Sequence, residues 1–195
     1  MSDSLTTSVL ASQAMLRERI AHTTHVSFPR QPRDLQNRAD SFLISACRHV
    51  SAVSDVLAGE ISRHGDPEQA RLVTRECHLL LVSMHTAKAR LYGSGNASRT
   101  PWGEVWEQVE VHFEALLVLE REAVEDLAGR LPAAELDALS GRMGRAEVHG
   151  STRPHPFLPR RGMPGWMART VCARTDGIWD NFEGRFAPKA SPAAN

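Results

Sequence analysis

Histidines on the apolar faces of expected helices are the main candidates for chemistry in this sequence. His49 stands beside Val50 in one amphipathic stretch, and His112 lies on the apolar stripe of another. His78 and His85 are two helical turns apart in a third stretch, which places them on the same face. Imidazole groups that converge inside a helix bundle are common metal ligands. The histidines therefore predict an interior metal site.

Two glutamates could complete such a site. Glu120 follows His112 by two turns on nearly the same side of its helix, and Glu60 follows His49 by about three turns. The candidate metal ligands are thus His49, His78, His85, His112, Glu120 and Glu60. The alternative is that each histidine sits at the edge of the core and is hydrogen-bonded to a neighbour or to water.

The cysteines give a weaker indication of metal binding. Cys47 with His49, and Cys77 with His78, could meet as a zinc site across two helices. Close neighbours on a helix diverge by about 100° per residue, which disfavours this arrangement. The three cysteines are odd in number and form no CxxC pair, so we expect a reducing cytoplasm rather than a disulfide framework.

Helix-start and helix-stop signals divide the middle of the chain into four helices. Asp34 can cap a helix over 35–64, and Asp66-Pro67 can open the next one, to about residue 92. The longest helical pattern, 100–131, ends at Pro132, and a fourth helix should follow to about residue 149. With short connections and no alternating strand pattern, residues 34–149 predict an all-α, up-and-down four-helix bundle.

The two ends of the chain differ in character from this bundle. Residues 1–33 are rich in Ser, Thr and Gln and favour a mobile arm; the alternative is a short helix over 11–22 with Leu10, Ala14 and Ile20 on one face. In the third region, 150–195, a Pro- and Gly-rich extended segment precedes an amphipathic C-terminal helix over 166–183. That helix could dock on the bundle's own flank or on a second copy, as a homodimer.

Composition excludes some partners. The chain has 195 residues, 42% of them hydrophobic, and its 23 basic and 23 acidic residues give a formal net charge of zero. Such a balance argues against a nucleic-acid partner. No run of about 18 apolar residues occurs, so we expect no membrane partner, and the N-terminal stretch has no export signal.

Several features together resemble one known family. The order of the four helices, the sequence LPAAELDALSGRM after a Glu-rich third helix, and the following TRPHP are similar to hemerythrin-like (HHE cation-binding) proteins, in particular a divergent actinobacterial-type branch. The resemblance covers about residues 35–159. It implies a four-helix bundle that holds two non-haem irons through histidines and bridging carboxylates, and that binds or senses dioxygen, nitric oxide or peroxide.

The family's signature pairs of ligands are missing from the expected helices, since His64 and Glu68, four residues apart, straddle the break at Gly65-Asp66-Pro67. A His and a Glu four residues apart present two ligands on one helix face. Here the residue four positions after each candidate histidine is aliphatic: Val53, Val82, Ala89 and Leu116. We therefore expect an eroded site with iron, mononuclear or di-iron, or no metal at all.

The expected function is accordingly a binding, sensing or regulatory role rather than catalysis. The first alternative is an active non-haem iron protein that handles a small diatomic ligand or peroxide, using the candidate ligands above. The second is a scaffold that contacts a protein partner through its C-terminal tail.

Overall fold

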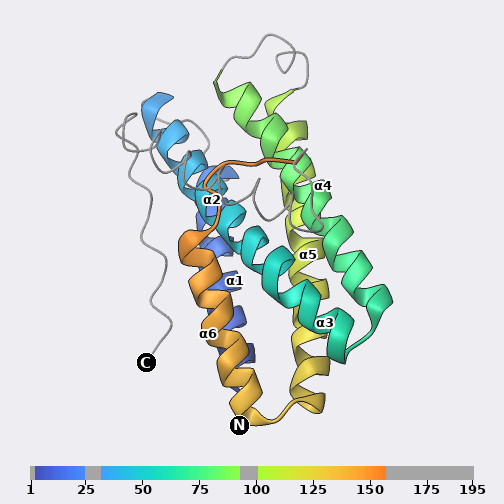
Figure 1. Ribbon diagram of the computed structural model, residues 1–195. Coiled ribbons are helices and arrows are strands. Elements are labelled where there is room, and N and C mark those ends of the chain that lie inside the picture. Colours follow the sequence, from blue (N-terminus) through green and yellow to red (C-terminus); the bar gives the residue numbers. More distant parts are fainter. Residues whose placement is uncertain (1–2, 25–31, 93–100, 157–195) are drawn as a thin grey trace.

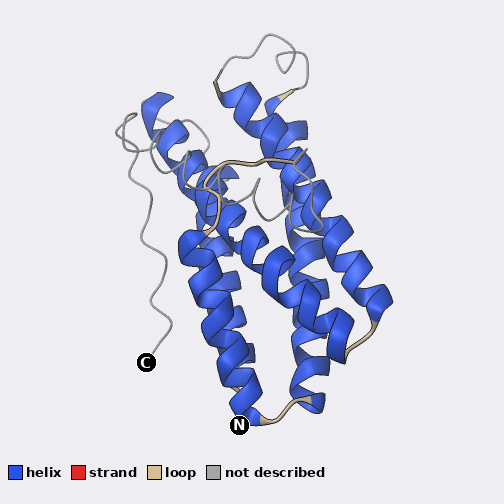
Figure 2. Ribbon diagram, viewed as in Figure 1, coloured by secondary structure: helices blue, strands red, loops and turns tan. Residues whose placement is uncertain are grey.

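The computed structural model describes residues 3–24, 32–92 and 101–156, and within these ranges it contains helices and no strand (Figures 1 and 2). The all-α class predicted from the sequence is confirmed. The α-helices are α1 (Ser4–Thr24), α2 (Pro32–Ala52), α3 (Ala58–His64), α4 (Pro67–Leu91), α5 (Trp102–Arg130) and α6 (Ala133–His149). The expected C-terminal helix lies outside the described residues, and with it the dimer contact. None of the described helices is long and apolar enough to cross a membrane.

Local signals in the sequence set most of the helix ends. The Asp66 side chain accepts a hydrogen bond from the Glu68 N–H at 2.8 Å, and Pro67 occupies the first helical position of α4. Pro132 separates α5 from α6. The expected boundaries at these points are confirmed to within a residue or two.

The expected helix over 35–64 contains a wider turn. A π-helical segment, η1 (Val53–Leu57), joins α2 to α3 without a break, and both of its end residues are buried. Bonding from residue i to i+5 winds the chain more loosely than an α-helix does. Residues on either side of η1 therefore do not follow one straight stripe, and His49 and Glu60, in line on an ideal helix, lose that alignment.

Helix α1 is the main difference from the sequence-based expectation. In place of a mobile arm, Ser4–Thr24 forms a continuous helix. Its buried stripe consists of Leu5, Val9, Leu16 and Ile20, each exposed by 6% or less. The short-helix alternative placed Leu10, Ala14 and Ile20 on one face; Ile20 is buried, but Ala14 is exposed and Leu10 is 42% exposed. Successive residues of this stripe are four, seven and four positions apart, which is typical of one helix face. The Ser- and Thr-rich composition of the segment drew attention away from this spacing.

This helix packs against α2, α5 and α6 (Figure 1). It is tied to α5 by Arg17, which donates to both oxygens of Glu114 at 3.1 and 2.8 Å. It is tied to α6 by the Ser12 hydroxyl, which donates to Glu147 at 3.4 Å. The described helices therefore form an assembly in which α1 links α5 to α6, an element that the four-helix expectation did not include.

Aromatic side chains fill the core between α2 and α5. Phe42 of α2 meets the edge of Phe113 of α5, with ring centroids 5.5 Å apart and planes at 89°. It also packs on Trp106 at 6.0 Å. Edge-to-face contacts of this kind favour a defined packing of the two helices. They place α5 against the stretch of α2 that leads to His49.

Candidate functional site

A buried histidine at the meeting point of three helices forms the centre of the candidate site. His49 of α2 is 3% exposed. Its Nε2 lies 3.0 Å from Oε2 of Glu120 on α5, and its Nδ1 lies 2.7 Å from Oε1 of Glu147 on α6. An ionised carboxylate only accepts hydrogen bonds, so both nitrogens must donate, and an imidazole that does so is the protonated, positively charged form. The site is thus a cation held between two carboxylates.

The electrostatics favour this charged form. Burial opposes the charge on His49, but the neighbouring Glu120 and Glu147 carboxylates outweigh it and raise the pKa of His49 from 6.5 to about 10. At neutral pH the ring is therefore an imidazolium.

Helix α1 contributes to the same cluster. The side-chain amide of Gln13 donates to Glu120 Oε2 at 2.8 Å and to the Leu117 carbonyl at 3.2 Å. Glu120 is fully buried, and its second oxygen, Oε1, has no hydrogen-bond partner among the described residues. We call Gln13, His49, Glu120 and Glu147 the His49 cluster. It connects four helices through their side chains.

A glycine allows α6 to come close enough for this contact. A Cβ atom at Gly150 would lie 3.0 Å from Arg48 Cα and 3.1 Å from the Arg48 carbonyl oxygen. Real Cβ contacts are rarely so short, and backbone atoms cannot easily move aside. Gly150 therefore permits the end of α6 to pack on the backbone of α2, one turn after Glu147 and beside His49.

The other sequence-predicted ligands lie elsewhere. His112 donates from Nδ1 to Glu76 of α4 at 2.5 Å and is partly exposed, at the boundary of α4 and α5. Glu60 is buried, accepts a hydrogen bond from Arg63 at 2.5 Å, and forms an ion pair with Arg142 of α6 at 3.2 Å. Both of these side chains act as ion-pair partners.

The remaining two candidates are on the outer part of α4, where His78 is half-buried and His85 is exposed. Two of the six predicted ligands, His49 and Glu120, form an ion pair with each other. The described residues therefore do not bring histidines from three helices together at one interior site.

The donor set does not fit two irons. In the described ranges, no group of three or more His, Cys, Asp or Glu side chains is arranged to hold a metal ion. The two nitrogens of His49 face opposite sides of the ring, so Glu120 and Glu147 lie on opposite sides and cannot share one ion with it. The weaker zinc alternative lacks support as well: Cys47 and Cys77 are buried thiols outside any such group.

Two members of the His49 cluster were missed from the sequence. Gln13 lies four residues after Val9 and three before Leu16, on the buried stripe of α1. Glu147 lies four residues after buried Met143 on α6. A polar residue on an apolar stripe is the signal that singled out His112. The same signal identifies Gln13 and Glu147 when it is applied to all polar residue types.

Comparisons of the chain with protein-family models, curated proteins and solved structures found no match. The class that the described residues define is an all-helical domain with a charged cluster in its interior. The hemerythrin-like resemblance remains a prediction from the sequence motifs.

Proposed function

We propose that this chain is a hemerythrin-like four-helix bundle, extended by an N-terminal helix, in which a hydrogen-bonded cluster has replaced the di-iron site. In this proposal the protein acts as a binding, sensing or regulatory protein and not as an oxygen-activating enzyme. The helices assigned to the bundle are α2 with α3, α4, α5 and α6, in the order that the resemblance implies.

One observation carries the proposal. Both nitrogens of His49 are engaged by carboxylates, at 3.0 Å from Glu120 and 2.7 Å from Glu147. A histidine that ligates a metal must offer one deprotonated nitrogen to the ion. Glu120 and Glu147 instead favour the protonated ring, so the groups best placed to be ligands stabilise the state that cannot bind a metal.

The ion pairs of the other candidates point in the same direction. His112 is paired with Glu76, and Glu60 with Arg63 and Arg142. Arginine beside a carboxylate competes with a metal ion for the same oxygen lone pairs. These contacts support a structural role for the polar residues in the interior. In this proposal, a ligand or partner would therefore bind at the surface of the molecule.

Metal content after reconstitution tests the proposal. Untagged protein would be incubated anaerobically with ferrous iron, desalted, and measured by elemental analysis and by absorption after exposure to air. We expect less than about one metal ion per chain and no oxo-bridged ferric band, because the donor set does not converge. His85→Gln serves as a matched control for incidental binding at an exposed histidine.

The rival function predicts the opposite result. About two tightly bound irons per chain, lost in Glu120→Ala, would show that the cluster rearranges into a di-iron centre. That outcome would reject the proposal in favour of an active non-haem iron protein.

A further inference from the structure

The side of α5 that faces away from the core is an acidic stripe with two valines in it. Its exposed residues follow one another at steps of three or four, which puts them on one side of the helix: Glu104, Glu107, Val111, Glu114, Val118, Glu122 and Glu125. Val111 is 55% exposed and Val118 is 39% exposed. The face of a surface helix opposite the core is normally polar, so these valines leave apolar area in water.

Helix α4 adds apolar surface beside this stripe. The two helices run in opposite directions (Figure 1), and the contact of Glu76 with His112 at 2.5 Å sets their relative level. Val111 stands next to His112. Leu72, one turn before Glu76, is 41% exposed and lies about level with the turn that contains Val118. We call the acidic stripe of α5 together with Leu72 the α4–α5 outer face.

The sequence that follows the described residues is complementary to this face. No acidic residue occurs between Glu147 and Asp176. Residues 157–175, which lie outside the described ranges, contain four arginines, Arg160, Arg161, Arg169 and Arg174, and the large apolar residues Met163, Trp166, Met167 and Val171. Basic and apolar side chains together are the composition that an acidic stripe with exposed valines favours.

The described chain ends where this segment can reach the outer face. After α6 it crosses α2 toward α4 (Figure 1), and Pro154 and Pro156 are buried. Residues 157–166 can span about 30 Å when extended, and α5, with 29 residues, is about 44 Å long. A tether of this kind gives a local concentration on the order of millimolar, which favours the segment of the same chain over that of a second copy.

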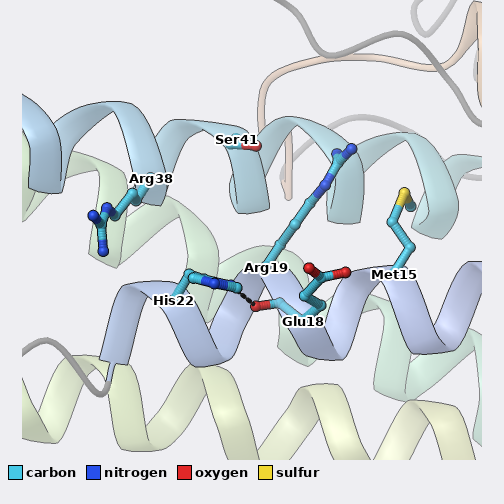
Figure 3. A pocket seen from close by; sticks show the side chains of 6 residues that line it. All are labelled: Met15, Glu18, Arg19, His22, Arg38 and Ser41. Carbon is cyan, nitrogen blue, oxygen red and sulfur yellow. Dashed lines mark hydrogen bonds between the residues drawn. The ribbon is translucent and has the colours of Figure 1, made fainter.

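The groove between α1 and α2 is a less suitable place for an arginine-rich segment. Its volume is about 380 Å³. Figure 3 shows the Arg19 and Arg38 side chains at separate ends of it, and the Glu18 carboxylate is the one acidic group among the residues that line it. Two arginines against one glutamate disfavour a basic occupant. Charge therefore selects the outer face over this groove.

We propose that residues 157–175 lie on the α4–α5 outer face of the same chain. The arginines of the segment pair with the glutamates of the α5 stripe, and its large apolar side chains cover Leu72, Val111 and Val118. A partner that binds this face has to displace the segment. The inference goes beyond the proposed function, because it concerns the surface and does not depend on metal content.

A spin label on Cys172 tests this arrangement in the full-length protein. Cys47 and Cys77 are buried, so a thiol-specific nitroxide should modify Cys172, and mass spectrometry checks that one label is added. The unpaired electron weakens the amide NMR signals of residues near it. We expect the strongest loss around Val111 and Val118, with recovery after the nitroxide is reduced. The strongest loss on α1, α2 or α6, or no localised loss, would overturn the inference.

A mixed sample distinguishes the same chain from a second copy. Nitrogen-15-labelled protein without the nitroxide would be mixed with spin-labelled protein that carries no nitrogen-15. We expect the signals around Val111 and Val118 to keep their intensity in this mixture. A loss as large as that within the spin-labelled molecule would show that a second copy supplies the segment, which contradicts the inference.

Charge-bearing variants of exposed apolar positions give the matched comparison. Val118→Arg should remove at least half of the signal loss on α5, because it replaces an apolar contact with a repelling charge. Leu10→Arg, at a 42% exposed position of α1, should leave the loss unchanged. If Val118→Arg does not fold, Val111→Arg takes its place. Equal loss in the α5 variant and in Leu10→Arg would reject the inference.

Failure of this inference is distinguishable from failure of the proposed function. Two bound irons per chain with an unchanged signal loss on α5 would reject the function and leave the segment on the outer face. Low metal content without a localised loss would do the reverse.

Discussion

At the scale of single residues, His49 is the side chain on which the interior depends. It places one positive charge between two carboxylates, and one of these, on Glu120, is completely inaccessible to water. A buried ion pair adds little net stability compared with apolar packing, but removal of one partner leaves the other charge unpaired. The cluster is therefore sensitive to substitution of its central cation.

His49→Gln should destabilise the protein by about 3 to 5 kcal/mol, because the buried Glu120 carboxylate loses its counter-ion. Urea unfolding followed by circular dichroism measures the difference. His85→Gln, at an exposed position of α4, should change the free energy of unfolding by no more than about 0.5 kcal/mol. Equal stability of the two variants would show that His49 is not charged in the folded protein.

The raised pKa of His49 also predicts how stability depends on pH. Because the folded state binds the proton more tightly than the unfolded state, the contribution is fully present below pH 6.5 and is lost as pH rises to about 10. The slope from this one group is at most about 1.4 kcal/mol per pH unit. Unfolding curves measured across this range should show the decline in the unaltered protein and a flatter profile in His49→Gln.

At the scale of the elements, the cluster depends on how closely α6 approaches α2. Gly150 allows that approach, because any Cβ atom there would press on the backbone of Arg48. The π-helical turn at Val53–Leu57 follows His49 in the chain. It rotates α3 relative to α2, so that the face of α3 that packs on the core differs from the one an uninterrupted α-helix would give. The position of His49 relative to α5 and α6 follows from both features.

Gly150→Ala should destabilise the protein by about 1 to 3 kcal/mol, as overpacking in a tight contact does. It should also lower the pKa of His49, because the end of α6 and with it Glu147 must move away. The matched control is Gly129→Ala on α5, where an added Cβ meets nothing within 4 Å. In the control, thermal unfolding should show unchanged or increased stability, since alanine favours helix over glycine by about 0.5 to 1 kcal/mol. If Gly150→Ala were as stable as this control, the close approach would not be required.

At the scale of the whole molecule, α1 belongs to the folded domain. Leu16 is fully buried, whereas Leu10, six positions earlier on the same helix, is 42% exposed. Leu16→Ala should cost about 2 to 5 kcal/mol, and Leu10→Ala about 0.5 kcal/mol or less. Thermal unfolding of the two variants gives the comparison. Similar, small effects at both positions would mean that α1 does not pack on the other helices.

Most of the helices could be predicted from the sequence, because their signals are local. Asp66 with Pro67, and Pro132, mark helix ends that need no tertiary contact to be recognised. The burial of α1 could not be predicted in this way, since it depends on apolar surfaces that α2, α5 and α6 provide together. Most of the stability of a helix in a protein comes from packing of its apolar face, so a Ser- and Thr-containing helix such as α1 depends on those neighbours.

Only part of the candidate site was within reach of the sequence. His49 and Glu120 were identified as inward residues, and the structure brings them together at 3.0 Å. His112 was expected to lie on the buried stripe of α5. It lies at the edge of that stripe and is partly exposed, whereas Phe113 beside it is buried. Periodicity gives a face to within about one residue, and relative helix rotation decides which neighbour enters the core. Register between helices also decided that Glu147, and not a second histidine, reaches His49.

The most direct test of the central claim is the protonation state of His49, measured by nitrogen-15 NMR of the histidine side chains in uniformly labelled protein at about pH 8.5. We expect an imidazolium signal with both nitrogens protonated that is absent in His49→Gln and unchanged by added ferrous iron. A His49 ring that is neutral at this pH, with one nitrogen that shifts when iron is added, would contradict the account and identify the cluster as a metal site.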